Sequence, residues 1–493
     1  MITNDQGLHD LKHHILKEVC LMAWNDNITH EERERLVHSI SPGPKPSYRC
    51  CIYKEREIVR GRMRLAMGIN PDVSRPTDNV VAVIPAACDD CPIQDHMVTD
   101  SCRFCLGKAC LKACRFGAIS PGDTKMKIDP NKCKSCGQCA QACPFSAIIH
   151  SKRPCQKSCP VGAISYDEYG LCTIDEAKCI HCGHCIHACP FGAIGSKIYV
   201  VDVIEAIKSG KRVIAMCAPA TEGQFGKEIG MAAIRSALKK VGFADMVEVG
   251  LGGDMTAACE AKEWIEAKKE GRKMTTSCCP AFISMLYKHF PEQYKENKST
   301  TVSTMVAVSR YLKSLDPDCV TVFIGPCIAK KWETKNKDLV DKPDYAMTFG
   351  EMVTLLDSKG IEITPVEEDY QESSLYGKRF AGSGGVAEAV LEAMREMGED
   401  TSDITLLRCA GGDECRKALL LLKSGRLKED FIEGMMCPGG CVGGPSKHQS
   451  VPLVEKARNS LLAAADNRTI LENLKNYPMD RFSMYRDGHM ENP

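Results

Sequence analysis

Residues 133–148 read CKSCGQCAQACPFSAI, and residues 179–194 read CIHCGHCIHACPFGAI. Each stretch carries four cysteines at the spacing C-x2-C-x2-C-x3-C, followed by proline. The closing phrase recurs in related form at residues 113–119 (ACRFGAI) and 158–164 (SCPVGAI). The first of these closes a variant run with a wider middle gap, and the second retains two cysteines. One small cysteine-rich unit is therefore used four times, which predicts a repeated metal-binding module.

The composition supports metal binding rather than disulfide bonding. The chain has 493 residues and 30 cysteines, and sixteen of these stand at ligand spacing between Cys88 and Cys189. No apolar run approaches the roughly 20 residues of a membrane-spanning helix. The start, MITNDQGLHDLKHH, lacks the apolar core of a secretory signal. We therefore expect a cytoplasmic protein, and disulfides are rare in that compartment. Lys+Arg and Asp+Glu are both 64, which argues against a nucleic-acid partner.

The spacing of the two full runs resembles that of bacterial ferredoxins, which bind 4Fe-4S clusters. Three cysteines of one run hold a cluster, and the fourth ligand comes from the paired run. The predicted sets are Cys102, Cys105 and Cys110 with Cys143; Cys133, Cys136 and Cys139 with Cys114; and Cys179, Cys182 and Cys185 with Cys159. Cys88, Cys91, Cys155 and Cys189 remain and suffice for a fourth cluster. The sequence leaves the number of clusters at three or four.

Zinc is the alternative metal. C-x2-C pairs are common in zinc sites, but structural zinc uses two separated pairs and has no need of a third evenly spaced cysteine. Zinc is therefore an alternative mainly for Cys88 and Cys91. His181, His184 and His187 interleave the last run. We expect them to be solvated, or neighbours of a cluster whose potential they tune, rather than ligands.

The pattern of apolar residues changes beyond the cysteine-rich module. VIAMCAP, VTVFIGP and DITLLRCAG are typical of buried strands, and VAEAVLEAMREMG of an amphipathic helix. The predicted fold class is an α/β catalytic domain preceded by ferredoxin-like iron–sulfur domains and a helical N-terminal region. The predicted domains are a helical region over 1–80, a ferredoxin-like 4Fe-4S domain over 81–150, a second such unit over 151–197, a catalytic domain over 198–450, and a C-terminal helical tail over 451–493.

The α/β part contains three short cysteine motifs. They are TSCCPAF at 276–282, IGPCIAKKWE at 324–333 and EGMMCPGGCVGG at 433–444. They are far apart in the sequence, so only the fold can bring them together. Cys279, Cys327, Cys437 and Cys441 would be enough for one buried 4Fe-4S cluster.

These motifs, in this order and behind ferredoxin repeats, resemble the iron-only (FeFe) hydrogenases over residues 85–445. The TSCCPAF form resembles the divergent group B of that family. The resemblance implies an H-cluster, in which a 4Fe-4S cubane is joined through one cysteine to a di-iron subcluster with carbon monoxide, cyanide and azadithiolate. It implies that Cys279, Cys327 and Cys437 bind the cubane and that Cys441 bridges to the di-iron unit.

The resemblance also assigns roles around the di-iron site. It implies that Lys330 contacts a cyanide ligand, that Met435 packs on the di-iron unit, and that Cys278, Glu260 and Glu263 relay protons. On a helix, the spacing of Glu260 and Glu263 places both on one face. A polar residue near Ser299 is expected between them. The plainer alternatives are a buried small apolar side chain for Cys278 and a solvated helix face for the two glutamates.

The function implied by the resemblance is that of an anaerobic ferredoxin hydrogenase, an oxidoreductase acting on dihydrogen. Its substrates would be dihydrogen and protons, its electron partner ferredoxin or a redox subunit, and maturation enzymes would build the H-cluster. Two alternatives use the same scaffold. A non-catalytic iron–sulfur electron carrier would be expected to lose part of the motif set. A hydrogen sensor would be expected to carry an appended signalling domain, which the sequence after the catalytic half does not suggest.

Overall fold

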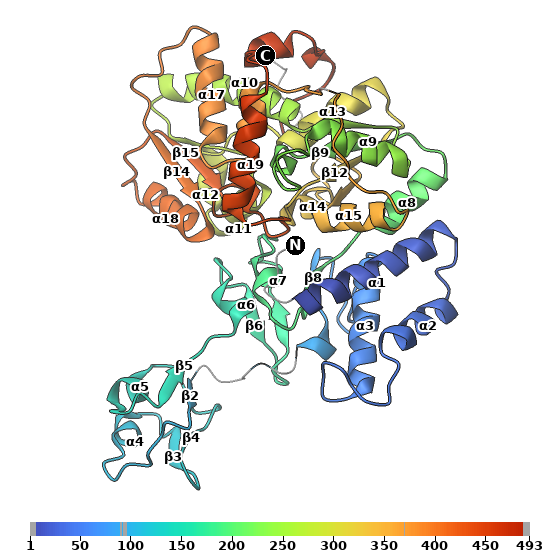
Figure 1. Ribbon diagram of the computed structural model, residues 1–493. Helices are drawn as coiled ribbons and strands as arrows, with labels where there is room; N and C mark the ends of the chain where they lie inside the picture. The colour runs from blue at the N-terminus through green and yellow to red at the C-terminus, as the bar shows by residue number, and fades with distance from the viewer. Residues whose placement is uncertain (1–5, 89–90, 92–95, 369, 487–493) are drawn as a thin grey trace.

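Two parallel sheets form the centre of the largest part of the molecule (Figure 1). The computed structural model describes residues 6–88, 91, 96–368 and 370–486. One sheet has the order β10-β9-β12-β13 and the other β11-β15-β14. The strands are β9 (Val213–Cys217), β10 (Asp245–Glu248), β11 (Met274–Thr275), β12 (Val320–Ile324), β13 (Tyr345–Met347), β14 (Leu406–Ala410) and β15 (Phe431–Met435). The strands β9, β12 and β15 are buried throughout, as parallel strands covered by helices on both faces must be.

Helices cover both sheets, and the predicted α/β fold class is confirmed. They are α8 (Val200–Lys208), α9 (Met231–Val241), α10 (Gly250–Lys269), α11 (Pro280–His289), α12 (Pro291–Glu296), α13 (Thr304–Leu315), α14 (Ala329–Glu333), α15 (Phe349–Asp357), α16 (Leu375–Arg379), α17 (Gly385–Glu396) and α18 (Gly412–Lys423), with short 3-10 turns at η2 (Pro219–Thr221) and η3 (Cys441–Gly443).

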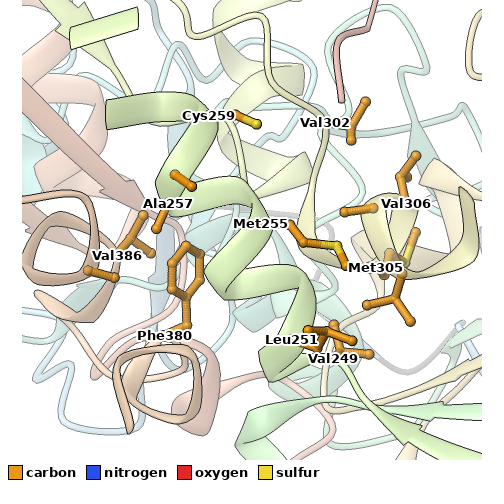
Figure 2. Packing of buried hydrophobic residues seen from close by; sticks show 14 of the residues in the cluster. Val249, Leu251, Met255, Ala257, Cys259, Val302, Met305, Val306, Phe380 and Val386 are labelled. Atoms are coloured by element: carbon orange, nitrogen blue, oxygen red, sulfur yellow. The ribbon is translucent and has the colours of Figure 1, made fainter. Parts of the chain in front are cut away.

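The helix α10 runs through the apolar core and is the element that carries Glu260 and Glu263. Figure 2 shows Phe380 and Val386 on one side of it and Met305 on the other. A helix that is buried nearly all round is held in a fixed position by packing. Gly252 permits its close approach to α13, because a Cβ there would lie 2.1 Å from the Thr304 carbonyl oxygen.

The N-terminal helices pack on the α/β part. They are α1 (Gln6–Trp24), α2 (His30–Ile40) and α3 (Ile52–Ala66). Ile15 and Val19 of α1 share one apolar cluster with Val203 of α8 and Leu355 of α15. The helical character predicted for residues 1–80 is present, and residues 1–5 lie outside the described residues. These helices therefore extend the main core instead of forming a separate one.

The cysteine-rich region consists of two units of the same topology. The inner unit contains β2 (His96–Val98), α4 (Ala109–Ala113), β3 (Ile119–Pro121), β4 (Met126–Ile128), α5 (Gln138–Ala142) and β5 (Ile148–His150); the outer unit contains β1 (Val81–Val83), η1 (Pro85–Ala87), α6 (Pro154–Lys157), β6 (Ile164–Tyr166), β7 (Cys172–Ile174), α7 (His184–Ala188) and β8 (Ile194–Ser196). In the inner unit β2 pairs with β5 and β3 with β4, and in the outer unit β1 pairs with β8 and β6 with β7. The two units therefore share one pairing pattern.

The inner unit is inserted into the outer one. The sequence predicts consecutive units at 81–150 and 151–197, but the pairing of β1 with β8 joins Val81–Val83 to the later unit. The inner unit, residues 96–150, thus lies between Cys91 and Cys155 in the chain. Figure 1 shows it as a lobe set apart from the rest of the molecule. The physical reason is a long-range strand pairing that no local spacing reveals.

The C-terminal segment belongs to the α/β core. It contains α19 (Val451–Ala463), α20 (Ile470–Leu474) and η4 (Met479–Arg481). Ile470 and Met484 are fully buried in the same apolar cluster as Met255 of α10. The sequence predicts a separate helical tail over 451–493; as far as residue 486 the segment packs inside the domain, and residues 487–493 lie outside the described residues. No helix in the described ranges is both long and apolar enough to cross a membrane.

Candidate functional site

Four cysteines from three distant loops meet between the two sheets. Cys279 is the N-cap of α11 just after β11, Cys327 follows β12, Cys437 follows β15, and Cys441 opens η3. Each of the three loops follows the carboxyl end of a parallel strand, which is where α/β folds form their ligand sites. The fold therefore brings together thiols that lie as many as 162 positions apart in the sequence.

The proximity of these thiols is evident in their electrostatics. Burial raises the pKa of Cys327 to about 11 and that of Cys441 to about 12, and the pKa of Cys437 is raised well above its ordinary value. In each case the neighbouring thiolates add to the effect of burial, and every pair among the four interacts. Such crowding is unfavourable for free thiolates and is relieved by bound cationic metal.

The residues present fit a 4Fe-4S group with an adjoining inorganic unit. Cys441 is exposed among the described residues although it interacts with the three other thiols, so room remains beside its side chain. Gly440, with φ +83°, has no room for a Cβ, which would lie 2.7 Å from the Ala381 carbonyl oxygen. The loop that carries Cys441 is therefore clamped against the glycine-rich segment 382–385, which it touches through a bridge between Gly382 and Gly440.

Lys330 and Met435 lie beside these thiols. The Lys330 side chain is 8% exposed, and its Nζ lies 3.0 Å from Glu333 Oε2. Its positive charge lowers the pKa of Cys278, Cys327 and Cys441 against the larger effect of burial. Met435 is buried at the end of β15. A buried ammonium with a single carboxylate partner retains donor capacity for an anionic ligand.

The groups predicted to relay protons lie close enough to one another to interact electrostatically. Cys278 lies next to Glu260 and Cys441, and burial raises its pKa well above the ordinary value. Burial and then Glu263 raise the pKa of Glu260 to about 7. Ser299 lies close to both carboxyl groups and lowers the pKa of each against the larger effect of burial. Burial also raises the pKa of Glu263, which is only partly buried, so these groups lead outwards from the thiol.

Ser277 and Thr300 hold these two carboxyl groups in place. The Ser277 N–H and hydroxyl donate to Glu260 Oε1 at 2.9 and 2.8 Å, and the Thr300 N–H donates to Glu263 Oε1 at 3.0 Å. The other carboxyl oxygen of this residue, Glu260 Oε2, is buried and has no hydrogen-bond partner among the described residues. Glu260 is thus buried without an ion-pair partner, and Glu263 is held by Thr300 although it is only partly buried. This disfavours the plain interpretation as a solvated helix face.

Each predicted set of ferredoxin-type ligands is gathered by the fold. In the inner unit, one cavity is lined by Cys102, Cys105, Cys110 and Cys143, and a second by Cys114, Cys133, Cys136 and Cys139. In the outer unit, Cys159, Cys179, Cys182 and Cys185 all interact with one another. Cys91 interacts with Cys88, Cys155 and Cys189. Four sulfurs around one space are the donor set of a 4Fe-4S cluster.

The outer unit touches the α/β site directly. Cys182 interacts with Cys327 and Cys437. His181 is buried and its Nδ1 lies 2.9 Å from Asn79 Oδ1. Burial, with the nearby Lys288 charge, lowers the pKa of His181 to about 3, so this histidine is neutral. Of the two expected positions, solvated or beside a cluster, its burial fits the second. The proximity of Cys182 to two site thiols leaves a short path for electrons.

Three residues near the site were not singled out by the sequence. Glu333 pairs with Lys330, and its i, i+3 spacing within the quoted motif is a signal that could have identified it. Ser277 stands next to Cys278 in TSCCPAF. Arg486, whose Nη2 donates to the Ser277 carbonyl oxygen at 2.9 Å, carries no local signal because it lies 209 positions away.

Comparison with known proteins agrees with this geometry. Residues 211–445 match the family described as iron only hydrogenase large subunit, C-terminal domain. Residues 126–149 match a 4Fe-4S binding domain, and residues 153–193 match a 4Fe-4S dicluster domain.

Three curated relatives cover the α/β part. NADP-reducing hydrogenase subunit HndD of Solidesulfovibrio fructosivorans is 25% identical over 71% of this chain and 62% of its own length. Iron hydrogenase 1 of Clostridium pasteurianum is 28% identical over 67% of this chain and 66% of its own length. Cytosolic iron-sulfur assembly component 3 of Rattus norvegicus is 25% identical over 43% of this chain and 56% of its own length. The chain thus spans less than two thirds of each relative.

The matched domains explain the cysteine content. The 4Fe-4S domains and the hydrogenase domain make 4Fe-4S clusters and an H-cluster the cofactors of this chain. With its site thiols between the two sheets of that domain and its ferredoxin-type units in front, the chain is an FeFe-hydrogenase-like protein.

Proposed function

We propose that the chain is an active FeFe-hydrogenase that interconverts dihydrogen with protons and electrons. The observation that carries the proposal is the junction at Cys278, which links Cys441 of the thiol group to the buried carboxyl of Glu260. A scaffold that only carried electrons would have no need of a thiol and two buried carboxyl groups in line. The bound H-cluster supplies the metal centre at which dihydrogen is split or formed.

The protein residues around that centre hold it and move protons. The resemblance to FeFe-hydrogenases implies that Cys279, Cys327 and Cys437 are the cubane ligands and Cys441 the bridging ligand, and the mutual proximity of the four thiols supports a shared cluster. Lys330 offers its ammonium to an anionic ligand. Cys278 exchanges a proton with Glu260, and Ser299 connects Glu260 to Glu263, which opens towards solvent. Proton transfer between such positioned groups is efficient when their pKa values lie near the working pH.

Electrons pass through the ferredoxin-type units. We assign four N-terminal clusters to the four thiol sets, including Cys88, Cys91, Cys155 and Cys189. The set that contains Cys182 adjoins Cys327 and Cys437 and is the last step before the H-cluster. Thirty free cysteines, all in the described part of the chain, suit a reducing compartment and support the cytoplasm as its location.

The inner lobe is the proposed contact for an acidic electron carrier such as ferredoxin. Residues 96–150 contain eight Lys and Arg against three Asp, in a chain of zero net charge. Leu106 is 99% exposed, and Phe104 lies beside it with the Lys108 ammonium 5.2 Å from its ring. An exposed apolar tip within basic surroundings suits a small acidic partner.

The proposal is tested by anaerobic maturation of the full chain followed by assays of both reaction directions. Infrared bands of metal-bound carbon monoxide and cyanide, together with evolution or uptake of dihydrogen, are expected. A matured chain with these bands and no turnover in either direction would refute the enzymatic assignment.

The second candidate is a non-catalytic iron–sulfur protein. It is favoured by the 25% identity to cytosolic iron-sulfur assembly component 3 over 43% of the chain. A chain of this kind would load its cubanes yet show no carbon monoxide or cyanide bands after co-expression with maturation enzymes. The same infrared spectrum therefore separates the two candidates.

A further inference from the structure

The outer unit has a fifth cysteine, Cys172, beside the thiol set of Cys88, Cys91, Cys155 and Cys189. Cys172 on β7 is 3% exposed, and its backbone N–H donates to Cys88 Sγ at 3.3 Å. Its thiol lies close to the sulfurs of both Cys88 and Cys155, and its one proton can be donated to either of them. Sulfurs that bind iron are thiolates and only accept hydrogen bonds, so the shared proton belongs to Cys172. Cys172 thus directs two donors at the ligand sulfurs.

The facing strand adds a second donor. Tyr166 pairs with Cys172 across the β6–β7 hairpin, and its buried hydroxyl lies near the Cys155 sulfur and has no hydrogen-bond partner among the described residues, so its proton is free for an acceptor at this site. The Arg153 guanidinium lies 3.8 Å above the centre of the Tyr166 ring and is 4% exposed. The positive charge of Arg153 favours the thiolate forms of Cys88 and Cys91. Tyr166 and Arg153 therefore favour additional negative charge on these sulfurs.

Two more arginines approach from the N-terminal helices. Arg62 of α3 is 7% exposed and interacts with Cys189, and its Nε has no partner among the described residues. Arg49 donates from Nη2 to the Ala87 carbonyl oxygen at 2.7 Å, next to Cys88. The nearby Asp167 is offset by Arg75 at 2.7 Å. The surroundings of this thiol set are thus strongly cationic.

The inner unit provides an internal comparison. In the β3–β4 hairpin Pro121 pairs with Met126, at the register where Tyr166 pairs with Cys172 in the outer unit. Met126 lines the cavity of the corresponding thiols, Cys102, Cys105, Cys110 and Cys143. Neither Pro121 nor Met126 has a side-chain donor. The donors are therefore a feature of the outer site and not of the shared fold.

We propose that Cys172, Tyr166 and the three arginines raise the reduction potential of the cluster held by Cys88, Cys91, Cys155 and Cys189, and so make it a holding site for one electron between the lobe and the α/β domain. The inference rests on the proposed assignment of these four ligands. Reduction adds one electron and transfers no proton, since the donors keep theirs. Hydrogen bonds to cluster sulfurs and nearby cations stabilise the added charge.

The test is a redox titration of the full-length holoprotein, followed by electron paramagnetic resonance. Cys88→Ala first identifies the cluster, because it is expected to remove its signal and about four iron atoms. Cys172→Ala is expected to keep that signal and iron, and to lower the reduced-to-oxidised ratio at a fixed potential about tenfold, which is about 59 mV for one electron. Cys172→Ser retains a donor and is expected to restore most of the shift.

Two further results decide the outcome. An unchanged midpoint in Cys172→Ala, or the loss of about four iron atoms in that variant, overturns the proposal, because Cys172 would then be either without influence or a ligand. Met126→Cys adds a thiol at the matching inner position and is expected to raise the potential of the inner cluster. Retention of iron and signal in Cys88→Ala would refute the ligand assignment and, with it, the proposal, while leaving the proposed hydrogenase activity standing.

Discussion

Cys278 stands between the sulfur of Cys441 and the carboxyl of Glu260. Replacement by alanine removes the thiol without touching any of the four assigned ligands. Since removal of a positioned proton-transfer group costs roughly 100- to 10,000-fold, Cys278→Ala is expected to lower turnover at least about 100-fold while its infrared bands remain. Rates of dihydrogen evolution and infrared spectra of the same samples measure both effects.

The matched control is Cys319→Ala, which removes another buried thiol, at the start of the segment that leads into β12. It is expected to retain the rate of the unmodified protein. Equal activity in the two variants would remove Cys278 from the proton path.

Glu263 influences the protonation of Glu260. Burial is the larger cause of the raised pKa of Glu260, about 7, and the Glu263 charge adds to it. Glu263→Gln removes that charge, which favours ionised Glu260 and lowers its pKa. The carboxyl band of Glu260 is therefore expected to disappear at lower pH in an infrared titration without substrate.

Glu266→Gln is the control, since Glu266 is an exposed residue of the same helix. It is expected to leave the titration of Glu260 unaltered. A midpoint that stays or rises in Glu263→Gln would contradict the electrostatic link between the two glutamates.

At the scale of elements, the position of α10 decides where Glu260 and Glu263 lie. A Cβ at residue 252 would stand 2.1 Å from the Thr304 carbonyl oxygen, so α10 must move away from α13. Gly252→Ala is expected to lower the free energy of unfolding by about 1–3 kcal/mol, as overpacked cores do. Denaturant unfolding of the apoprotein measures it.

Gly230→Ala is the comparison variant. Gly230 has φ −84° at the N-cap of α9, and a Cβ there would have no neighbour within 4 Å. Its expected cost is about 0.5–1 kcal/mol, the usual difference between glycine and alanine at an N-cap. A Gly252→Ala protein as stable as Gly230→Ala would show that α10 tolerates displacement.

The sequence could predict what local spacing determines. The α/β class follows from strands such as Val320–Ile324, and the thiol sets follow from runs such as Cys133 to Cys143. Long-range pairing has no such local signal. The sequence therefore groups β1 with the unit at 81–150, whereas β1 pairs with β8 of the outer unit. The reach of Arg486 to Ser277 has no sequence signal either, because it depends on how the last segment packs.

At the scale of the whole molecule, the lobe formed by the inner unit, residues 96–150, is more basic than the chain as a whole and stands apart from the rest of the molecule (Figure 1). If the lobe receives an acidic carrier, Arg103→Glu combined with Lys108→Glu is expected to lower kcat/KM for ferredoxin about tenfold, and less at high salt, because surface charges steer association. Activity with a small viologen dye is expected to stay the same, since that dye needs no docking surface.

Arg416→Glu combined with Lys423→Glu, two exposed positions of α18, changes the net charge by the same amount and serves as the charge-matched control. It is expected to leave the ferredoxin kinetics unchanged. Equal losses in the lobe and body variants would indicate a general effect of net charge rather than a docking surface on the lobe.

The insertion of one unit within another also fixes an order of synthesis. Cys88 and Cys91 leave the ribosome before the lobe, and Cys155 and Cys189 only after it. Every thiol of the lobe is therefore available before the surrounding unit has its last sulfur. Iron delivered to the growing chain can fill the lobe first, and the early pair must wait, unfilled and open to oxidation, until translation has passed residue 189.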